Sequence, residues 1–275
     1  MANLLNLFNL EKKTAMITGG GGVLCSVMSK ALASIGVNVA VLDLNEETAQ
    51  AVADEIIAGG GKAIAVKCDV LNKESVQNAF DQVIQTYPSI DFLINGAGGN
   101  KAQATTSAEK TFFDLPADAV QFVFNLNFLG TFIPSQVVGK AMAEKGEGVI
   151  INISSMNSFR PLTRIPAYSA AKASVSNFTQ WLAVHMAQEY SPKIRVNALA
   201  PGFFLTEQNR FLLTDAASGE LTARGKTIIQ HTPAGRFGTP EDLLGTLIWL
   251  LSPAAEFVTG IVVPVDGGFS AFSGV

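Results

Sequence analysis

Short apolar runs alternate along the chain with longer stretches of helical character. The runs are five to seven residues long and rich in Val, Ile, Leu and Ala, as strands are, and the stretches between them are long enough for crossover connections. This pattern predicts seven strands, at residues 14–18, 38–43, 62–68, 91–95, 149–154, 195–199 and 261–265.

The order of these elements predicts the fold class. A nearly continuous apolar strand such as 39–42 suits a parallel sheet that is covered on both faces. At 275 residues the chain is long enough for one such domain but short for two catalytic domains. We therefore predict a single doubly wound α/β domain over residues 1–275, with a seven-stranded parallel sheet, helices on both faces, and Pro264 placing the last strand at an edge.

Charge and apolar content limit the partners of the protein. A net charge of −4, without a run of Lys or Arg, argues against binding to nucleic acid. No apolar run reaches the roughly 18 residues of a membrane helix, and residues 1–10 lack the basic leader of a signal peptide. A hydrophobic content of 48% against 15% charged residues favours an oligomer.

The cysteines indicate the compartment. Cys25 and Cys68 form no metal-ligand pattern, and two cysteines are too few for a disulfide framework. We therefore expect a reduced, cytoplasmic environment and no bound metal.

A glycine cluster follows the first predicted strand and precedes a helical stretch at 23–35. Glycines in such a turn, here Gly19 to Gly22, let backbone N–H groups approach a pyrophosphate, and the N-terminus of the following helix favours the negative charge. A glycine cluster alone is as often a simple tight turn. The order strand, turn, helix and second strand favours a dinucleotide site.

Asp43 ends the second predicted strand, twenty-four residues after Gly19. A carboxylate at this place accepts hydrogen bonds from the ribose hydroxyls of adenosine and repels a 2′-phosphate. Neither the glycine turn nor the two positions after Asp43 contain Arg or Lys, so we predict NAD rather than NADP. Alternatively, Asp43 is an exposed residue that caps a helix beginning near Asn45.

Tyr168 and Lys172 are four residues apart, which places both side chains on one face of a helix, and Ser155 follows the fifth predicted strand. A free phenol has a pKa of about 10, and a neighbouring ammonium favours the phenolate. A hydroxyl at Ser155 is placed to bond the oxygen of a carbonyl or alcohol. The three residues indicate proton transfer beside a substrate oxygen, although a Tyr/Lys pair at this spacing also occurs by chance.

Taken in order, these motifs resemble the short-chain dehydrogenase/reductase family over about residues 8–270. The resemblance rests on the glycine turn, Asp43, Cys68-Asp69-Val70, Asn95-Gly96-Ala97-Gly98, Asn127, Ser155, Tyr168, Lys172 and Pro201-Gly202. It implies a Rossmann-type domain that binds a dinucleotide, and a homotetramer.

The resemblance also implies a role for each matched residue. Ser155, Tyr168, Lys172 and Asn127 would be catalytic, with Asn127 holding a water in a proton relay. The residues expected to contact the cofactor, which include the glycine turn, are Gly19, Gly21, Gly22, Val23, Leu24, Asp43, Asp69, Val70, Asn95, Gly96, Ala97, Gly98, Tyr168, Lys172, Pro201, Gly202 and Thr206.

Three positions depart from the family pattern. Val23 and Cys25 stand where the second and third glycines of the turn are usual, and Gly96 replaces the second Asn of a common Asn-Asn-Ala-Gly turn. Cys25 is small enough for close packing between helix and strand, whereas Val23 does not readily take a positive φ. The departures put the contacts to the pyrophosphate in question, but not dinucleotide binding itself.

Candidate substrate residues lie in two loops. Arg160 and Arg164 precede Tyr168, and Asn209 and Arg210 belong to an expected lid at about 203–235. An arginine fork binds a carboxylate and amides bind hydroxyls, which together suggest a polyhydroxy acid. The alternative is that these are solvated loop residues.

The sequence therefore predicts an NAD-dependent oxidoreductase that interconverts a secondary alcohol and a ketone. The glycine turn and the tail 266–275 are similar to those of sugar-acid oxidoreductases of the family, including D-mannonate/D-fructuronate enzymes, so a sugar acid of that type or a gluconate-type substrate is expected. The alternatives are a non-catalytic NAD-binding regulator, an NAD-dependent reductase of a non-sugar carbonyl, and a sugar epimerase or dehydratase that keeps its NAD bound.

Overall fold

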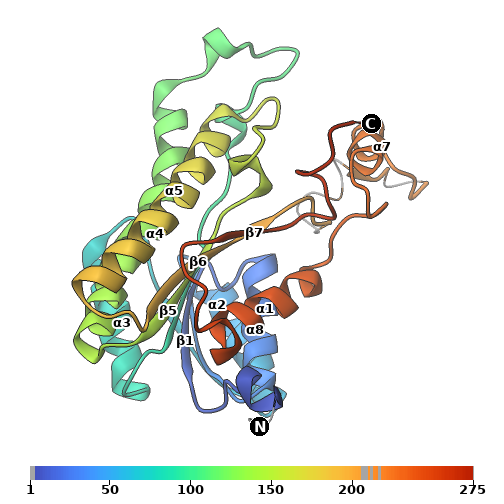
Figure 1. Ribbon diagram of the computed structural model, residues 1–275. Coiled ribbons are helices and arrows are strands. Elements are labelled where there is room, and N and C mark those ends of the chain that lie inside the picture. The colour runs from blue at the N-terminus through green and yellow to red at the C-terminus, as the bar shows by residue number, and fades with distance from the viewer. Residues whose placement is uncertain (1–3, 206–209, 211–212, 216–217, 275) are drawn as a thin grey trace.

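A seven-stranded parallel sheet forms the centre of the protein (Figure 1). The computed structural model describes residues 4–205, 210, 213–215 and 218–274. The strand order is β3-β2-β1-β4-β5-β6-β7. Their bounds are Thr14–Thr18 (β1), Asn38–Asp43 (β2), Lys62–Lys67 (β3), Phe92–Asn95 (β4), Gly148–Ile153 (β5), Ile194–Pro201 (β6) and Val262–Val265 (β7). The predicted fold class is confirmed, and Pro264 lies on an edge strand paired only with β6.

Helices cover both faces of the sheet. One face is covered by α1 (Val23–Ser34), α2 (Glu46–Ala58) and α8 (Leu244–Leu251), and the other by α3 (Lys73–Thr86), α4 (Ala117–Lys145) and α5 (Pro166–Glu189). Helix α7 (Ala223–Gln230) lies apart from the sheet, beside the C-terminus (Figure 1). Shorter 3₁₀ turns are η1 (Leu4–Phe8), η2 (Ala102–Ala104), η3 (Phe112–Asp114), η4 (Met156–Ser158), η5 (Pro240–Leu243) and η6 (Pro253–Ala255).

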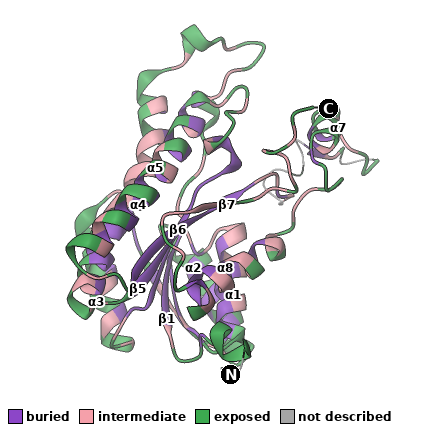
Figure 2. Cartoon of the chain, viewed as in Figure 1, coloured by how far each residue is buried: buried purple, intermediate pink, exposed green. Residues whose placement is uncertain are grey.

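Alternate residues of each strand divide the core into two layers. Along β1, Ile17 packs in a cluster with α1, α2 and α8, whereas Met16 packs in a second cluster with α3, α4 and α5. Because side chains alternate across a strand, a strand that is apolar throughout buries both faces. The strands are accordingly buried along the centre of the molecule, with the exposed residues on the outer sides of the helices (Figure 2).

The sheet brings the carboxyl ends of its strands to one edge, and the candidate residues lie there. This is where open parallel sheets bind their ligands. Along the part of the chain that the structure describes, no helix is both long and apolar enough to span a membrane. No cluster of His, Cys, Asp or Glu among the same residues is arranged to hold a metal ion.

Candidate active site

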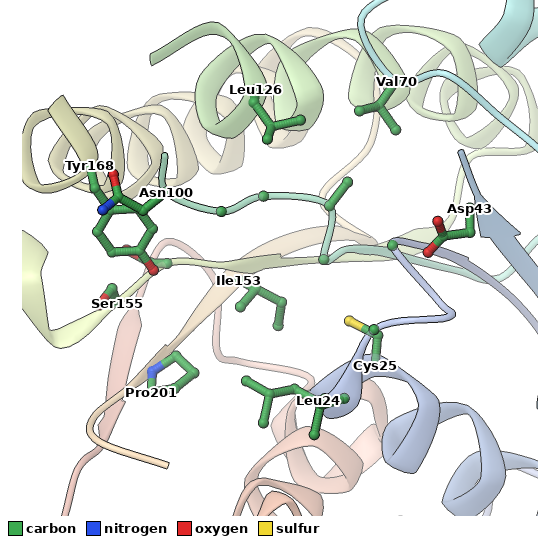
Figure 3. Close-up of a pocket in the computed structure, with 18 of the residues that line it drawn as sticks. Leu24, Cys25, Asp43, Val70, Asn100, Leu126, Ile153, Ser155, Tyr168 and Pro201 are labelled. Carbon is green, nitrogen blue, oxygen red and sulfur yellow. The ribbon is translucent and has the colours of Figure 1, made fainter. Parts of the chain in front are cut away.

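A cavity of about 640 Å³ opens at the carboxyl ends of β1, β2, β4, β5 and β6. Asp43 lies at one end of it and Tyr168, Ser155 and Asn100 at the other, with Ile153 between them (Figure 3). Most of the predicted site residues line it, namely Gly19, Gly22, Val23, Leu24, Asp43, Asp69, Val70, Gly96, Ala97, Gly98, Ser155, Tyr168, Pro201 and Gly202.

Other lining residues were not predicted. They are Cys25, Leu44, Cys68, Gly99, Asn100, Leu126, Ile153, Ser154, Phe203 and Phe204. Most are chain neighbours of a predicted residue, so extending each motif by one or two positions finds them. Leu126, which precedes Asn127 on α4, is an ordinary apolar helix residue in the sequence, and only the packing of α4 over the cavity reveals it.

Ser155 and Tyr168 meet at the end of the cavity opposite Asp43 (Figure 3). Ser155 lies two residues after β5 and is the N-cap of η4, where its Oγ accepts a hydrogen bond from Asn157 N at 3.3 Å. Its hydroxyl also hydrogen bonds to the Tyr168 phenol, which lowers the pKa of Tyr168, but burial is the larger effect and leaves that pKa above its ordinary value. The phenol is therefore a proton donor at neutral pH.

Lys172 lies one helical turn after Tyr168 on α5 and is almost fully buried. Its Nζ donates to Ile153 O at 2.7 Å and lies 5.6 Å from the centre of the Tyr168 ring. Burial lowers the pKa of Lys172 to about 8. The expected lowering of the tyrosine pKa by Lys172 is not observed, because the ammonium faces the ring and a carbonyl while the phenol is withdrawn from water.

Asn127 is fully buried on α4 and holds the segment that follows β4. Its Nδ2 donates to Gly99 O at 2.7 Å and to Val123 O at 2.8 Å, and its Oδ1 accepts from Gly99 N at 3.2 Å. The side chain thus binds backbone on its own helix and on the cavity wall. This geometry fixes residues 98–99 near Lys172, and the predicted water relay stays a prediction.

The glycine turn is tied to the strands beside it. Gly19 has a φ of +64°, and a Cβ there would lie 2.8 Å from Ala97 Cα, so only glycine fits. Gly20 N donates to Leu42 O at 2.9 Å, and Gly21 N donates to Asp43 Oδ2 at 3.0 Å. The extra glycines therefore bind protein groups rather than leaving their amides open to the cavity.

The backbone conformation at the N-terminus of α1 is one that Val23 can adopt. Val23 is the first residue of the helix and needs no positive φ, because Gly22 before it is the N-cap with φ −74°. The first helical amide to bond within α1 is that of Ser26, to Gly22 O at 2.8 Å. The amides of Val23 and Leu24 precede it and belong to the unsatisfied donors of a helix N-terminus.

Asp43 is held by two backbone amides. Its Oδ2 accepts from Gly21 N and its Oδ1 from Asn45 N, both at 3.0 Å. The cap of α2 is Asn45 and not Asp43, since Asn45 Oδ1 accepts from Glu47 N and Thr48 N. The alternative reading of Asp43 as a helix cap is therefore wrong, and its carboxylate lies in the cavity wall.

Asn95 lies away from the cavity lining. Its Nδ2 donates to Ser135 Oγ at 3.0 Å and to Asn152 Oδ1 at 2.8 Å, and Asn152 in turn donates to Thr179 Oγ1 at 2.9 Å. This buried network joins β4 and β5 to α4 and α5. The Asn95 side chain thus supports the strands beneath the site instead of facing a cofactor.

The two predicted substrate arginines do not line this cavity. Arg160 is exposed and its Nη1 donates to Phe272 O at 3.1 Å, so it holds the C-terminal tail. Arg164 has a φ of +74° and lines a separate cavity of about 560 Å³ beside Phe112. Thr206 and Asn209 lie outside the described residues, and Arg210 is described but is absent from the cavity lining.

A family model described as enoyl-(acyl carrier protein) reductase, one of those for short-chain dehydrogenases, matches residues 24–270. The chain belongs to the short-chain dehydrogenase/reductase family. It is therefore an oxidoreductase, and the predicted family is confirmed.

Several members of the short-chain dehydrogenase/reductase family match over almost their full length. An uncharacterized oxidoreductase UxuB of Bacillus subtilis (strain 168) is 51% identical, covering 97% of this chain and 98% of the relative. The crystal structure of a candidate D-mannonate oxidoreductase from Haemophilus influenzae, with bound NAD, is 51% identical with a TM-score of 0.92, covering 99% of this chain and 100% of that chain.

A third relative of the short-chain dehydrogenase/reductase family binds the other dinucleotide. The crystal structure of a gluconate 5-dehydrogenase from Burkholderia cenocepacia J2315, in complex with NADP and tartrate, is 32% identical to this chain. Its TM-score is 0.87, and the match covers 98% of this chain and 100% of that chain.

Proposed function

We propose that the protein is an NAD-dependent oxidoreductase that interconverts a secondary alcohol and a ketone on a polyhydroxy acid. The observation that carries this proposal is the contact between Ser155 and Tyr168 at one end of a cavity whose other end holds Asp43 (Figure 3). An acid/base pair and a ribose-binding carboxylate in one cleft are what hydride transfer between a dinucleotide and an alcohol requires.

The residues present fit a dinucleotide. Gly19, Gly96 and Gly98 form a wall without side chains, and a Cβ at any of them would lie within 3.0 Å of another atom. The N-terminal amides of α1 and the positive end of its dipole are suited to a pyrophosphate. When bound, the nicotinamide supplies or accepts the hydride.

The protein's own residues handle the proton. Tyr168 is protonated at neutral pH, since burial raises its pKa, and it is placed to donate that proton to a carbonyl oxygen. Ser155 Oγ is within hydrogen-bonding reach of the phenol and polarises the same oxygen. Oxidation of an alcohol reverses both roles. Lys172, held by Ile153 O, keeps a positive charge beside the ring below about pH 8.

Asp43 favours NAD over NADP. The amides of Gly21 and Asn45 fix its carboxylate, so it cannot easily turn away from a 2′-phosphate. Bringing an additional negative charge to a fixed carboxylate is unfavourable unless a cation compensates. The 51% identical Haemophilus structure holds NAD, whereas NADP is found in a relative of 32% identity.

A sugar acid is the proposed substrate, of the D-mannonate/D-fructuronate or gluconate type. The support comes from the relatives, a candidate D-mannonate oxidoreductase and a gluconate 5-dehydrogenase. In the cavity, Asn100 lies beside Tyr168 and Ser155, and an amide is a suitable partner for sugar hydroxyls (Figure 3). We further propose that residues 203–235 form a lid and that the protein is a cytoplasmic homotetramer.

The experiment is a panel of carbonyl substrates assayed with NADH and with NADPH. The proposal expects NADH oxidation with keto sugar acids, and none by the Tyr168→Phe variant. Turnover only of a non-sugar ketone would move the function to the reductase alternative. Dinucleotide binding without turnover of any carbonyl or alcohol would contradict the enzyme assignment and favour a regulator.

A further inference from the structure

Two of the departures from the family pattern meet in space. Cys25, in the first turn of α1, is 4% exposed and lies against the backbone of Gly96, which follows β4. A Cβ on Gly96 would overlap Cys25 Sγ. The thiol therefore occupies the space into which a side chain at position 96 would extend, and the two exchanges compensate for each other.

The chain segment at Gly96 forms part of the cavity wall, and it is held from two sides. On the α1 side, Thr18 Oγ1 accepts from Gly96 N at 3.1 Å and from Ala97 N at 3.3 Å. On the α4 and α5 side, a Cβ on Gly98 would lie 2.6 Å from Asn127 Oδ1 and 3.3 Å from Lys172 Nζ. A displacement at Gly96 would thus shift the wall that adjoins the catalytic lysine.

We propose that Cys25 is a positioning residue for the dinucleotide: its thiol fills the space over Gly96 and so fixes the cavity wall of residues 96–99 between α1 and the Asn127/Lys172 pair. The proposal rests on the proposed dinucleotide binding. The thiol acts through its shape, because burial raises the pKa of Cys25 to about 12 and keeps it protonated. Cys25 therefore needs no reactivity for this role.

Substitutions at Cys25 separate shape from chemistry. Cys25→Ser keeps nearly the same shape and removes the sulfur, so the affinity for NADH stays within about threefold. Cys25→Gly leaves a void over Gly96 and weakens NADH binding about tenfold. NADH affinity is measured by fluorescence titration of the full-length protein. In steady state, the loss appears in the KM for NADH and much less in kcat.

A double-variant cycle tests the contact itself. Gly96→Ala alone drives a methyl group into Cys25 Sγ and weakens NADH binding about tenfold or more. Adding Cys25→Gly removes the overlap and recovers most of that loss. Recovery is incomplete, because the added Cβ still lies 2.9 Å from Thr18 O. The interaction between the two changes is the evidence for a steric pair.

A control variant and a check that each variant folds are needed to interpret these affinities. Gly245→Ala, in α8 with no atom within 4 Å of the added Cβ, leaves NADH affinity unchanged. If Gly96→Ala fails to fold but the double variant folds, the steric pair is supported. If neither folds, the comparison of Cys25→Ser with Cys25→Gly decides.

Equal NADH affinity in Cys25→Gly and the wild type would overturn the proposal, as would a double variant that binds no better than Gly96→Ala. Failure of the wild type to bind either dinucleotide would instead refute the proposed cofactor. The two failures are therefore distinguishable.

Discussion

The two ends of the cavity are built in different ways: the proposed cofactor end at Thr18 and Asp43, and the proposed substrate end at Ser155, Tyr168 and Phe203. At the cofactor end, Thr18 Oγ1 accepts two backbone amides and the Asp43 carboxylate accepts two more. At the proposed substrate end, the rings of Phe203 and Phe269 of the tail are in contact with centroids 5.2 Å apart, and exposed Arg160, in the loop after β5, donates a hydrogen bond to the tail. Hydrogen bonds between side-chain oxygens and backbone amides fix the first region, whereas a ring contact and a hydrogen bond from an exposed side chain hold the second.

The two ends of the cavity should therefore differ in the substitutions that they tolerate. A strand end fixed by several hydrogen bonds leaves little freedom in what the first region binds, whereas a wall made of loops and the C-terminal tail adapts to new substrates by substitution. The tail lies beside α7 (Figure 1), and Ala234 N, in the segment after that helix, donates to Gly267 O at 3.0 Å. We expect related chains to share the cofactor end and to differ at the substrate end.

The largest effect is expected on turnover, through Tyr168 at the proposed substrate end. Tyr168→Phe removes the proton donor while keeping the ring, so kcat falls by about 10²–10⁴-fold and the affinity for NADH changes little. Steady-state rates and a fluorescence titration with NADH measure the two quantities. An active Tyr168→Phe enzyme would contradict the proton-transfer role.

The next largest effect is expected on the preference between NADH and NADPH, through Asp43 at the proposed cofactor end. Asp43→Ser removes the fixed negative charge, so the ratio of kcat/KM for NADPH to that for NADH rises about 10- to 100-fold. The matched control is Asp54→Ser, an exposed change on α2 that leaves the ratio unaltered. An unchanged ratio in Asp43→Ser would show that another group selects the dinucleotide.

The titration of Lys172 affects stability rather than selectivity. Its pKa is lowered from 10.5 to about 8 in the folded protein, so between these values the unfolded chain binds a proton that the folded one has lost. The contribution of Lys172 to the free energy of unfolding therefore increases by about 1–3 kcal/mol as the pH rises through this window. It decreases by the same amount as the pH falls. Denaturant unfolding at several pH values should show this rise for the wild type and a smaller one for Lys172→Met.

The smallest effect is expected at Arg160, which holds the tail at the proposed substrate end. Arg160→Ala removes one exposed hydrogen bond to the tail, so the substrate KM rises about two- to fivefold while the KM for NADH is unchanged. Arg164→Ala, in the separate cavity, serves as the control and leaves both constants unaltered. Equal effects of the two variants would deny Arg160 its role in holding the tail.

The predicted cofactor residues line the cavity more often than the predicted substrate residues do, for a physical reason. Strand ends, the glycine turn and Asp43 follow from periodicity and from backbone requirements, which are local. The direction of Arg164 depends on a left-handed backbone at that residue, with φ +74°, which nothing in its neighbours predicts. The partner of Asn95 also escaped prediction, because Ser135 is forty residues away along the chain.

The contact between Cys25 and Gly96 is an example of what the sequence alone does not predict. Both departures are visible in the sequence, yet their compensation needs the distance between α1 and the end of β4. The raised pKa of Tyr168 is similar, since desolvation in the cavity wall outweighs the hydrogen bond from Ser155. Contacts between distant segments and the degree of burial were the quantities missing.

A crystal structure of the Tyr168→Phe variant with NADH and a keto sugar acid would test the central claim most directly. We predict the reacting carbonyl oxygen at about 2.6–3.2 Å from Ser155 Oγ, with the position of the missing phenol oxygen on its other side. A carbonyl bound away from both Ser155 and the residue 168 ring would contradict the account.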